Sequence, residues 1–338
     1  MRRLSQLATC ALPLLVLGGC RGVQTMLDPA GDQASHITLI WRAMLMVCGL
    51  MYLLVLGFLA WALWRARRTK GDDAPLPSQT PADPALARGL SGWVALIVAG
   101  LITLTTVSFL VDRSIAEVGP DPLKITVTAN QWWWEVTYSG ETPKDTFTTA
   151  NELHLPIDRP AVIKLVANDV IHSFWVPNLA GKTDLIPGRT NYIAVTPRRL
   201  GQFRGQCAEF CGFQHAQMAF DVFVETPQAF SAWQQAQLQP SAQPTSGDAV
   251  AGRAVFTSRA CNMCHAIDGV RQGQSVGPDL THVASRTHIA AGALTNTPEN
   301  LAGWIADPQG IKPGSTMPQV GLKPEELTAV TAYLESLK

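Results

Sequence analysis

The amino-acid sequence predicts a multi-domain membrane protein with a hairpin of two transmembrane helices, an all-β domain and an all-α domain, in that order. Three observations carry this prediction. Two long apolar stretches lie in the first third of the chain, a run of alternating apolar and polar residues follows, and helical periodicity replaces the alternation after Gly247. A chain of 338 residues is long enough for several domains that each bury a core.

The composition agrees with a chain that lies partly in lipid. Charged residues make up 15% of the sequence, hydrophobic residues make up 47%, and the formal net charge is zero. A neutral chain has no global basic field, so we expect no nucleic-acid partner. The cysteines fall in the leader, in the first span and in two later pairs, which leaves none for an obvious structural disulfide framework.

Residues 1–20 resemble a secretory signal peptide. Arg2 and Arg3 precede an apolar run from Leu7 to Leu17, which is the order of charge and hydrophobicity in such leaders. The run ends in Leu-Gly-Gly-Cys20, which resembles a bacterial lipoprotein cleavage box. We therefore expect Cys20 to become a lipidated N-terminus, and an uncleaved leader with an incidental cysteine is the alternative.

The two apolar stretches cover residues 37–64 and 90–111, and each can cross the roughly 30 Å hydrocarbon layer of a bilayer. Residues 65–89 connect them. The basic residues of this loop are Arg65, Arg67, Arg68, Lys70 and Arg88. The positive-inside bias makes the loop cytoplasmic. We therefore expect a multi-pass protein of the bacterial inner membrane whose two later domains lie on the periplasmic side.

Residues 122–226 are predicted to form an all-β sandwich or small barrel. Leu123–Ala129, Ala161–Val166 and Ala219–Val224 alternate in the manner of half-buried strands, and proline and glycine separate the runs. Residues 227–247 follow as a short helix and a linker. The linker is rich in Gln, Pro and Ser and has no core-forming residues, so we expect it to be flexible.

Residues 248–338 are predicted to be helical, with helices at Asp248–Thr257, Pro298–Ala306 and Pro324–Leu337. This segment contains Cys261-Asn-Met-Cys264-His265, which indicates covalent attachment of haem c. The two thiols suit thioether bonds to the haem vinyls, and His265 would be the proximal ligand. A half zinc site or a redox dithiol would need partners that this region lacks. Short helices around an attached haem are typical of a class I cytochrome c domain.

The distal haem ligand is predicted to be Met317, which lies in a Met-Pro loop, because Met/His ligation raises the potential as an electron carrier requires. His282 and His288 are alternatives. Arg286 and Trp304 are candidates to contact the haem propionates, and a surface ion pair and a core aromatic are the competing interpretations of these two residues.

One short stretch of the β region holds two thiols, an imidazole and a thioether. Its residues are Cys207, Cys211, His215 and Met218. Soft sulfur beside imidazole favours copper. Gly212 favours a loop over a helix, so both thiolates can reach the same small volume. A site with one thiolate holds a single copper, whereas two bridging thiolates can hold two.

A further imidazole ligand is needed from elsewhere in the chain. His172 is the best candidate, because it lies at a predicted strand end before a proline. His154 is the alternative, although it lacks this loop context. A disulfide between Cys207 and Cys211 is also an alternative for exported cysteines, but it would leave His215 without a role.

At these residues the chain resembles subunit II of haem–copper cytochrome c oxidases. The matching elements are Gln131-Trp-Trp-Trp134, Asp169-Val-Ile-His172-Ser173, Gly181–Arg189 and the block Cys207–Met218. With the paired spans before these elements and the cytochrome c segment after them, the resemblance covers nearly the whole chain. It fits the caa-type form, in which a cytochrome c is fused to the subunit.

The resemblance implies a cupredoxin fold of Greek-key type that carries the dinuclear, mixed-valence CuA centre. It implies bridging ligands Cys207 and Cys211, terminal ligands His172 and His215, and weak axial ligands Met218 and the main-chain carbonyl of Glu209. It also implies a magnesium ion, shared with subunit I, on the Glu209 carboxylate. Trp132 matches the electron-entry residue of the family.

The implied function is that of the electron-input subunit of a terminal oxidase. An external donor such as cytochrome c reduces the haem, and the electron passes through copper to haem in subunit I. Oxygen is reduced to water there, with proton translocation, so no residue of this chain is catalytic. The expected partners are subunit I, the other oxidase subunits, the donor and the membrane.

Two other functions are weighed against this one. A component of a nitrous oxide or nitric oxide reductase system is the first, but nitrous oxide reductase needs a large His-rich propeller and the chain has only 7 histidines. A copper carrier is the second, but a copper carrier has no use for covalent haem.

One departure from the family is Leu90, which occupies the place of a glutamate with a role in proton uptake. The role in proton uptake is therefore not assigned to this chain.

Overall fold

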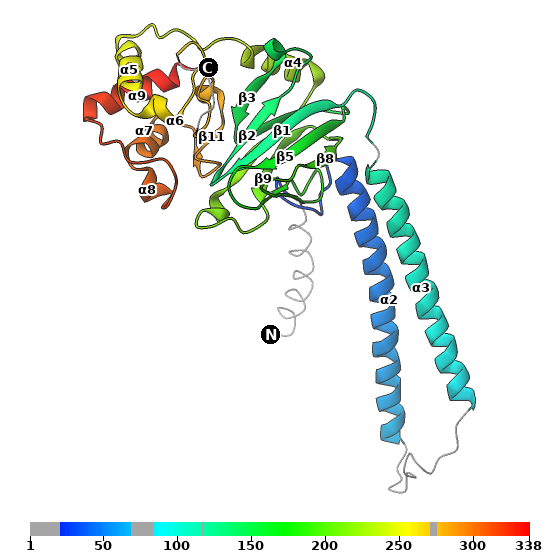
Figure 1. Ribbon diagram of the computed structural model, residues 1–338. Coiled ribbons are helices and arrows are strands. Elements are labelled where there is room, and N and C mark those ends of the chain that lie inside the picture. Colours follow the sequence, from blue (N-terminus) through cyan, green and yellow to red (C-terminus); the bar gives the residue numbers. More distant parts are fainter. Residues whose placement is uncertain (1–20, 69–83, 117, 271–275) are drawn as a thin grey trace, which may run out of the picture. The chain divides into compact units, whose positions relative to one another are not determined.

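The computed structural model describes residues 21–68, 84–116, 118–270 and 276–338 (Figure 1). The expected signal peptide with Cys20 and the middle of the loop 65–89 lie outside these residues. The described residues divide into two compact units. One unit holds residues 21–35 with 118–338, and the other holds residues 36–116.

Within the described segments, two helices are long and apolar enough to cross a membrane. They are α2 (Asp32–Arg68) and α3 (Pro84–Ala116). Both extend beyond the apolar stretches that the sequence marks, because the helical conformation continues into their polar flanks. In α2 the first turn holds Asp32 and the last turn holds three arginines, and these charges oppose the helix dipole at both ends.

The β region forms two five-stranded sheets packed face to face. The first sheet has the order β3 (Phe147–Ala150), β2 (Trp133–Tyr138), β1 (Leu123–Asn130), β5 (Ala161–Ala167) and β8 (Asn191–Val195). The second has the order β4 (Glu152–Pro156), β10 (Ala219–Glu225), β9 (Gly201–Cys207), β6 (His172–Trp175) and β7 (Thr183–Leu185). The pairs β1–β5 and β4–β10 are parallel, and the other pairs are antiparallel. The predicted all-β sandwich is confirmed.

The sandwich buries the apolar side of each alternating strand. In β1 every second residue from Leu123 onward is buried, as the period of two requires. Trp134 lies at the centre of the core, where its ring packs edge-on against Phe174 and Phe220. Tyr138 is also buried, and its hydroxyl donates to the main-chain oxygen of His154 at 2.9 Å. This last contact joins the two sheets.

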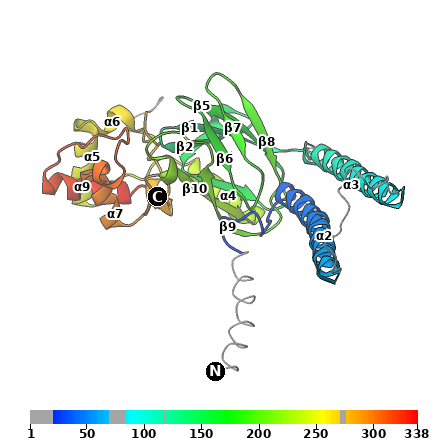
Figure 2. The same ribbon diagram turned by 90° about the horizontal axis from the view of Figure 1, so that it is seen from below.

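The C-terminal region is mainly helical, as predicted (Figure 2). Its elements are α5 (Gly247–Ser258), α6 (Cys261–Cys264), α7 (Pro298–Ala306), α8 (Pro308–Ile311) and α9 (Pro324–Glu335), with the short strands β11 (His288–Ile289) and β12 (Leu294–Thr295). Ser246 caps α5 and Thr297 caps α7 through side-chain oxygens. Gly252 lets α5 approach α9 closely, because a Cβ there would lie 1.9 Å from the main-chain oxygen of Ala329.

The linker between the two domains makes more contacts than its composition predicts. It follows α4 (Pro227–Gln237). Ser241 is buried and its hydroxyl donates to the main-chain oxygen of Asp268 at 2.7 Å. The oxygen of Gln239 accepts from His282 Nε2 at 3.1 Å. Polar linker residues thus bond to the loops of the helical domain, which no local pattern indicates.

Candidate metal centre and adjoining cavity

The strand pairing of the second sheet brings the predicted copper ligands to one end of the sandwich. Cys207 is the last residue of β9, and it lies opposite Phe174 of the neighbouring strand β6. His172 is the first residue of β6, so it stands beside the loop that leaves β9. That loop returns to the sheet through a short 3₁₀ turn at His215–Gln217 and reaches β10 directly after Met218.

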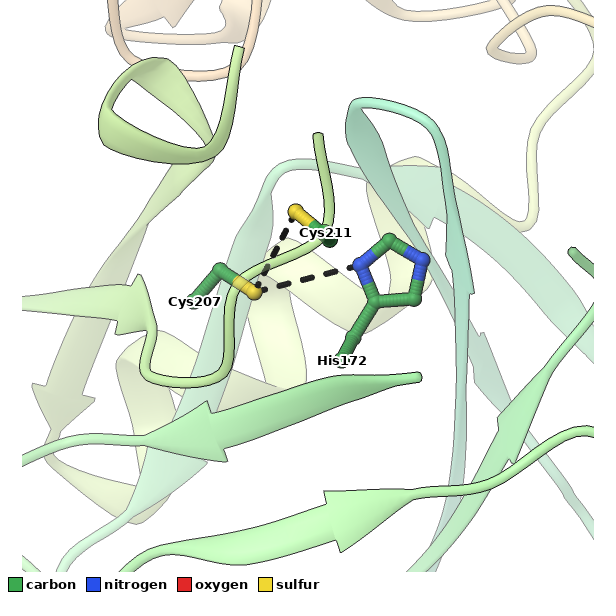
Figure 3. Close-up of side chains that lie close together, drawn as sticks. All are labelled: His172, Cys207 and Cys211. Carbon is green, nitrogen blue, oxygen red and sulfur yellow. Dashed lines mark hydrogen bonds between the residues drawn. The ribbon is translucent and has the colours of Figure 1, made fainter. Parts of the chain in front are cut away.

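Three ligand atoms form the centre of this cluster (Figure 3). The Sγ atom of Cys207 lies 3.7 Å from Cys211 Sγ and 3.8 Å from His172 Nδ1. All three ligand atoms lie within 4.8 Å of one another and all three residues are buried. The two cysteines are free thiols, and their separation is far longer than the roughly 2 Å of a disulfide bond.

The remaining predicted copper ligands surround the same thiols. Cys211 Sγ lies 3.6 Å from His215 Nδ1 and 3.8 Å from Met218 Sδ. The main-chain oxygen of Glu209 lies 3.2 Å from Cys207 Sγ. One small volume thus contains two thiols, two imidazole nitrogens, a thioether and a carbonyl. This donor set suits copper.

The thiols of Cys207 and Cys211 differ in how readily they lose a proton. A hydrogen bond with Cys211 lowers the pKa of the Cys207 thiol. The Cys207 thiolate in turn raises the pKa of the Cys211 thiol. The pair therefore holds one proton that a bound cation would displace, as thiolate ligation requires.

Asp169 orients the first imidazole. Its Oδ1 lies 2.8 Å from His172 Nε2, which leaves Nδ1 directed at Cys207. Asp169 also accepts hydrogen bonds from the main-chain N–H groups of Gln131 and Val170. The carboxylate is therefore fixed both by its own turn and by the turn that holds Gln131. No role for Asp169 was predicted from the sequence, although its position three residues before the histidine indicates one.

Trp132 is bonded directly to the cysteine loop. Its Nε1–H donates to the main-chain oxygen of Cys211 at 3.0 Å, and Gln131 Nε2 donates to the same oxygen at 2.7 Å. Gly212 lies against the indole with φ +112°, and a Cβ there would meet Trp132 Cζ2 at 3.0 Å. A glycine is therefore required for the indole to lie this close to the loop.

A cavity of about 310 Å³ lies in the helical domain beside this tryptophan. Its walls include the four residues predicted to hold haem, namely Cys261, Cys264, His265 and Met317. His265 donates from Nδ1 to the main-chain oxygen of Pro278 at 2.8 Å, which leaves Nε2 available as a ligand. Burial lowers the pKa of His265, so the neutral imidazole that binds metal is favoured. Gly277 permits this ring position, because a Cβ there would meet His265 Cε1 at 2.7 Å.

The cavity fits a haem in two further respects. Its lining is mainly apolar, and Arg286 on the wall has a buried Nε without a hydrogen-bond partner among the described residues. A haem has an apolar ring and carboxylate substituents, which match these two features. Trp132 and Trp133 of the sandwich complete the lining, so the cavity ends at the residue that is bonded to the cysteine loop.

Polar contacts fix the helical domain to the sandwich around this cavity. The main-chain N–H of Ala219 donates to the oxygen of Ala291 at 3.0 Å. Asp221 Oδ2 lies 2.6 Å from His288 Nδ1, and His282 bonds to the linker, so both alternative distal ligands have a nitrogen engaged elsewhere. The Nζ of Lys312 donates to the main-chain oxygen of Trp132 at 2.8 Å. Sequence reasoning missed Lys312, which no motif marks.

The chain has two long apolar helices, followed in the sequence by a cluster of copper-type ligands and a cavity suited to haem. This combination defines a membrane-anchored electron-transfer protein. Comparison with known proteins identifies the family. Residues 141–225 match the family described as cytochrome c oxidase subunit II, periplasmic domain, and residues 249–338 match the cytochrome c family. The chain belongs to the cytochrome c oxidase subunit 2 family, in the form with a fused cytochrome c domain.

Three curated relatives extend this match over most of the chain. Cytochrome c oxidase subunit 2 of Alkalihalophilus pseudofirmus is 35% identical, and the alignment covers 99% of each chain. The protein of the same name from Bacillus subtilis is 30% identical, with 97% of this chain and 96% of the relative covered. That of Bacillus sp. PS3 is 32% identical over 80% of each chain.

Membership of this family confirms several predictions in their general form. The chain is a subunit of an oxidoreductase complex, with a cupredoxin-like domain that implies copper and a cytochrome c domain that implies haem. Its role is electron input, in association with subunit I and other oxidase subunits. The two apolar helices indicate membrane anchoring, with the family's periplasmic domain on the outer side.

Proposed function

We propose that this chain accepts electrons from an external donor such as cytochrome c at a covalently bound haem c and passes them through a dinuclear CuA centre to haem in subunit I. Oxygen is reduced to water there, coupled to proton translocation. The haem and the copper pair supply the one-electron chemistry. The observation that carries the proposal is Trp132, because it lines the haem cavity and donates a hydrogen bond to the cysteine loop.

The copper ligands in this proposal are the residues that surround the two thiols. Cys207 and Cys211 bridge the copper ions, His172 and His215 are the terminal ligands, and Met218 and the Glu209 carbonyl are weak axial ligands. The distances of 3.2–3.8 Å among these atoms support a common site. Asp169 holds His172 in the tautomer that directs Nδ1 to the metal.

The residues that hold haem in this proposal all belong to the wall of the cavity. Cys261 and Cys264 form the thioether bonds, His265 is the proximal ligand and Met317 is the distal ligand. All four line one cavity, and the hydrogen bond from His265 to Pro278 fixes the proximal ring. Trp132 is the electron-entry residue of the copper centre.

The membrane arrangement and the magnesium site complete the proposal. Residues 37–64 and 90–111 cross the bacterial inner membrane, and residues 122–226 and 248–338 form the copper and haem domains on the periplasmic side. The side chain of Glu209 is exposed, which suits a carboxylate that binds magnesium at the contact with subunit I. Leu90 offers no proton-accepting group, so proton uptake is left to other parts of the complex.

The substitution Cys211→Ser tests the copper assignment in the purified intact oxidase. We expect the near-infrared mixed-valence absorption to disappear, because one bridging thiolate is lost, while the haem c spectrum is unchanged. Cys48→Ser is the matched control, since Cys48 is a free, exposed cysteine in the first long helix, and both signals should persist. Retention of the near-infrared absorption in Cys211→Ser would refute the assignment.

A further inference from the structure

The haem cavity contains an unusual buried lysine. Lys312 follows α8 and is only 3% exposed. Lysine is almost never buried to this degree without a partner of opposite charge. Across the described ranges of the chain, no carboxylate lies within ion-pair distance of its Nζ.

Lys312 instead joins the two domains through main-chain oxygens. Its Nζ donates to the oxygen of Trp132, in the sandwich, at 2.8 Å and to the oxygen of Ala290, in the helical domain, at 3.1 Å. An ammonium group has three N–H donors, so one donor is left over. Because Lys312 also lines the cavity, a ligand in the cavity is the natural acceptor for it.

The lysine and arginine side chains on the cavity wall have no carboxylate beside them among the described lining residues. Lys312 and Arg286 are its lysine and arginine residues, and the described lining contains no aspartate or glutamate. Arg286 is buried, its guanidinium donates to the main-chain oxygen of Asp279, and its Nε has no partner among the described residues. The carboxylates of Glu152 and Asp279 act on Arg286 electrostatically, but neither forms an ion pair with it among the described residues. Burial of two cations that lack ion-pair partners is costly, and a ligand that supplies negative charge would offset that cost.

The pKa of Lys312 also indicates that no nearby negative charge fully compensates the charge of the buried ammonium group. Desolvation lowers the pKa of Lys312 to about 7, and the neighbouring thiol group of Cys211 opposes this only in part. An anion at the remaining N–H would favour the charged amine. The hydrogen bonds of both side chains go to main-chain oxygens, so their charges are free to balance the carboxylates of a bound group.

We propose that Lys312 is a positioning residue that holds one propionate of the haem and, through its second N–H, the main chain of Trp132, while Arg286 holds the other propionate. Lys312 thereby fixes the carboxylate edge of the haem against the residue that is bonded to the cysteine loop. This inference rests on the proposed function, since it requires haem in the cavity.

The arrangement gives Lys312 two separable effects. Its positive charge beside a propionate disfavours the oxidised haem, which carries one more positive charge than the reduced form, and so raises the haem potential. Its hydrogen bond to Trp132 keeps the haem edge and the indole in a fixed relation. The rate at which a bound haem would pass an electron to bound copper would depend on this fixed relation.

The test uses the intact oxidase with Lys312→Met, which keeps the length of the side chain and removes the charge. Haem content by pyridine haemochromogen and copper content by metal analysis should equal those of the wild type. We expect a lower haem c midpoint potential and a several-fold slower transfer of electrons from haem to copper after flash photoreduction. Lys312→Arg should restore the potential, because it restores the charge.

Lys323→Met is the matched control, because Lys323 is an exposed lysine of the same domain and should leave both the potential and the rate unchanged. An unchanged haem potential in Lys312→Met would overturn the propionate contact, even if the rate fell. An unchanged rate would overturn the positioning role. Absence of haem or copper from the wild type would instead refute the proposed function.

Discussion

The copper site and the haem cavity are built in opposite ways. At the copper site the chain alone brings the donors together, and Cys207, His172 and Met218 are each at most 2% exposed. In the helical domain the residues proposed to hold haem, Cys261, His265 and Met317, are half-buried and line a cavity of about 310 Å³. The donors of the first site are packed against one another by the chain itself, whereas those of the second line the wall of an apolar cavity.

This difference follows from the size of the two groups. Metal ions occupy little space, so sheet pairing and hydrogen bonds can fix the ligands in advance, as Asp169 does for His172. A haem is larger than any side chain, and it must supply much of the apolar core of a small helical domain. We therefore expect loss of haem to affect folding and loss of copper to affect chemistry.

The largest effect is predicted for the double substitution of Cys261 and Cys264 by serine, which prevents covalent attachment. The apolar wall of the cavity would then lack the group that it packs against, so the helical domain should lose roughly 3–5 kcal/mol or more, the cost of removing one large buried side chain. Limited proteolysis and hydrogen exchange of α5 and α9 in the intact protein measure this loss. The sandwich should retain its copper.

The matching removal in the other domain is Cys207→Ser. It should abolish the copper spectrum and leave hydrogen exchange of β9 and β10 nearly unchanged. Comparable loss of protection in both domains would show that the contrast between them is wrong.

A smaller effect is predicted for Met317→Leu, which keeps the volume of the side chain and removes the distal sulfur. Because axial ligands set haem potentials over a range of roughly 0.8 V, we expect the haem c potential to fall by about 100 mV or more. A shift of 100 mV corresponds to about 2 kcal/mol for one electron. An unaltered potentiometric titration would point to another distal ligand.

The smallest effect concerns a buried cluster in the sandwich that binds no metal in this account. Burial disfavours the charged imidazole of His154, but hydrogen bonds with Glu152 and Glu225 outweigh it and raise its pKa. A raised pKa in the folded state stabilises the fold below about pH 6.5, and this stabilisation is lost as pH rises through the folded-state pKa.

His154→Gln should remove this pH-dependent contribution, with a loss of about 1 kcal/mol at the acidic side of the window. The measurement is hydrogen exchange of β4 and β10 on both sides of the window, corrected for the intrinsic rate. Equal pH dependence in the wild type and the variant would exclude His154 as its origin.

Local patterns predicted most of the fold. Alternation located β1, β5 and β10, and Pro298 and Pro324 marked the first residues of α7 and α9. The cysteine loop and the haem motif are also local, because each group needs several donors within a few residues. His172 and the proposed distal ligand Met317 lie outside these two motifs, and each was predicted from its own sequence context.

Contacts between domains had no such signal. Lys312 lies in Gly-Ile-Lys-Pro-Gly, which is typical of an exposed turn, yet it is buried against Trp132. The linker around Ser241 has the composition of a flexible tether, but it bonds to the helical domain. Such contacts depend on which surfaces face each other in three dimensions, and composition carries no information on that.

The most direct test of the central claim is the metal and haem content of the intact protein, combined with the redox state of its thiols. The account predicts two coppers and one covalent haem for each chain, with Cys207 and Cys211 as thiolates in the active oxidase. A single copper, or a disulfide between these cysteines in fully active protein, would contradict it.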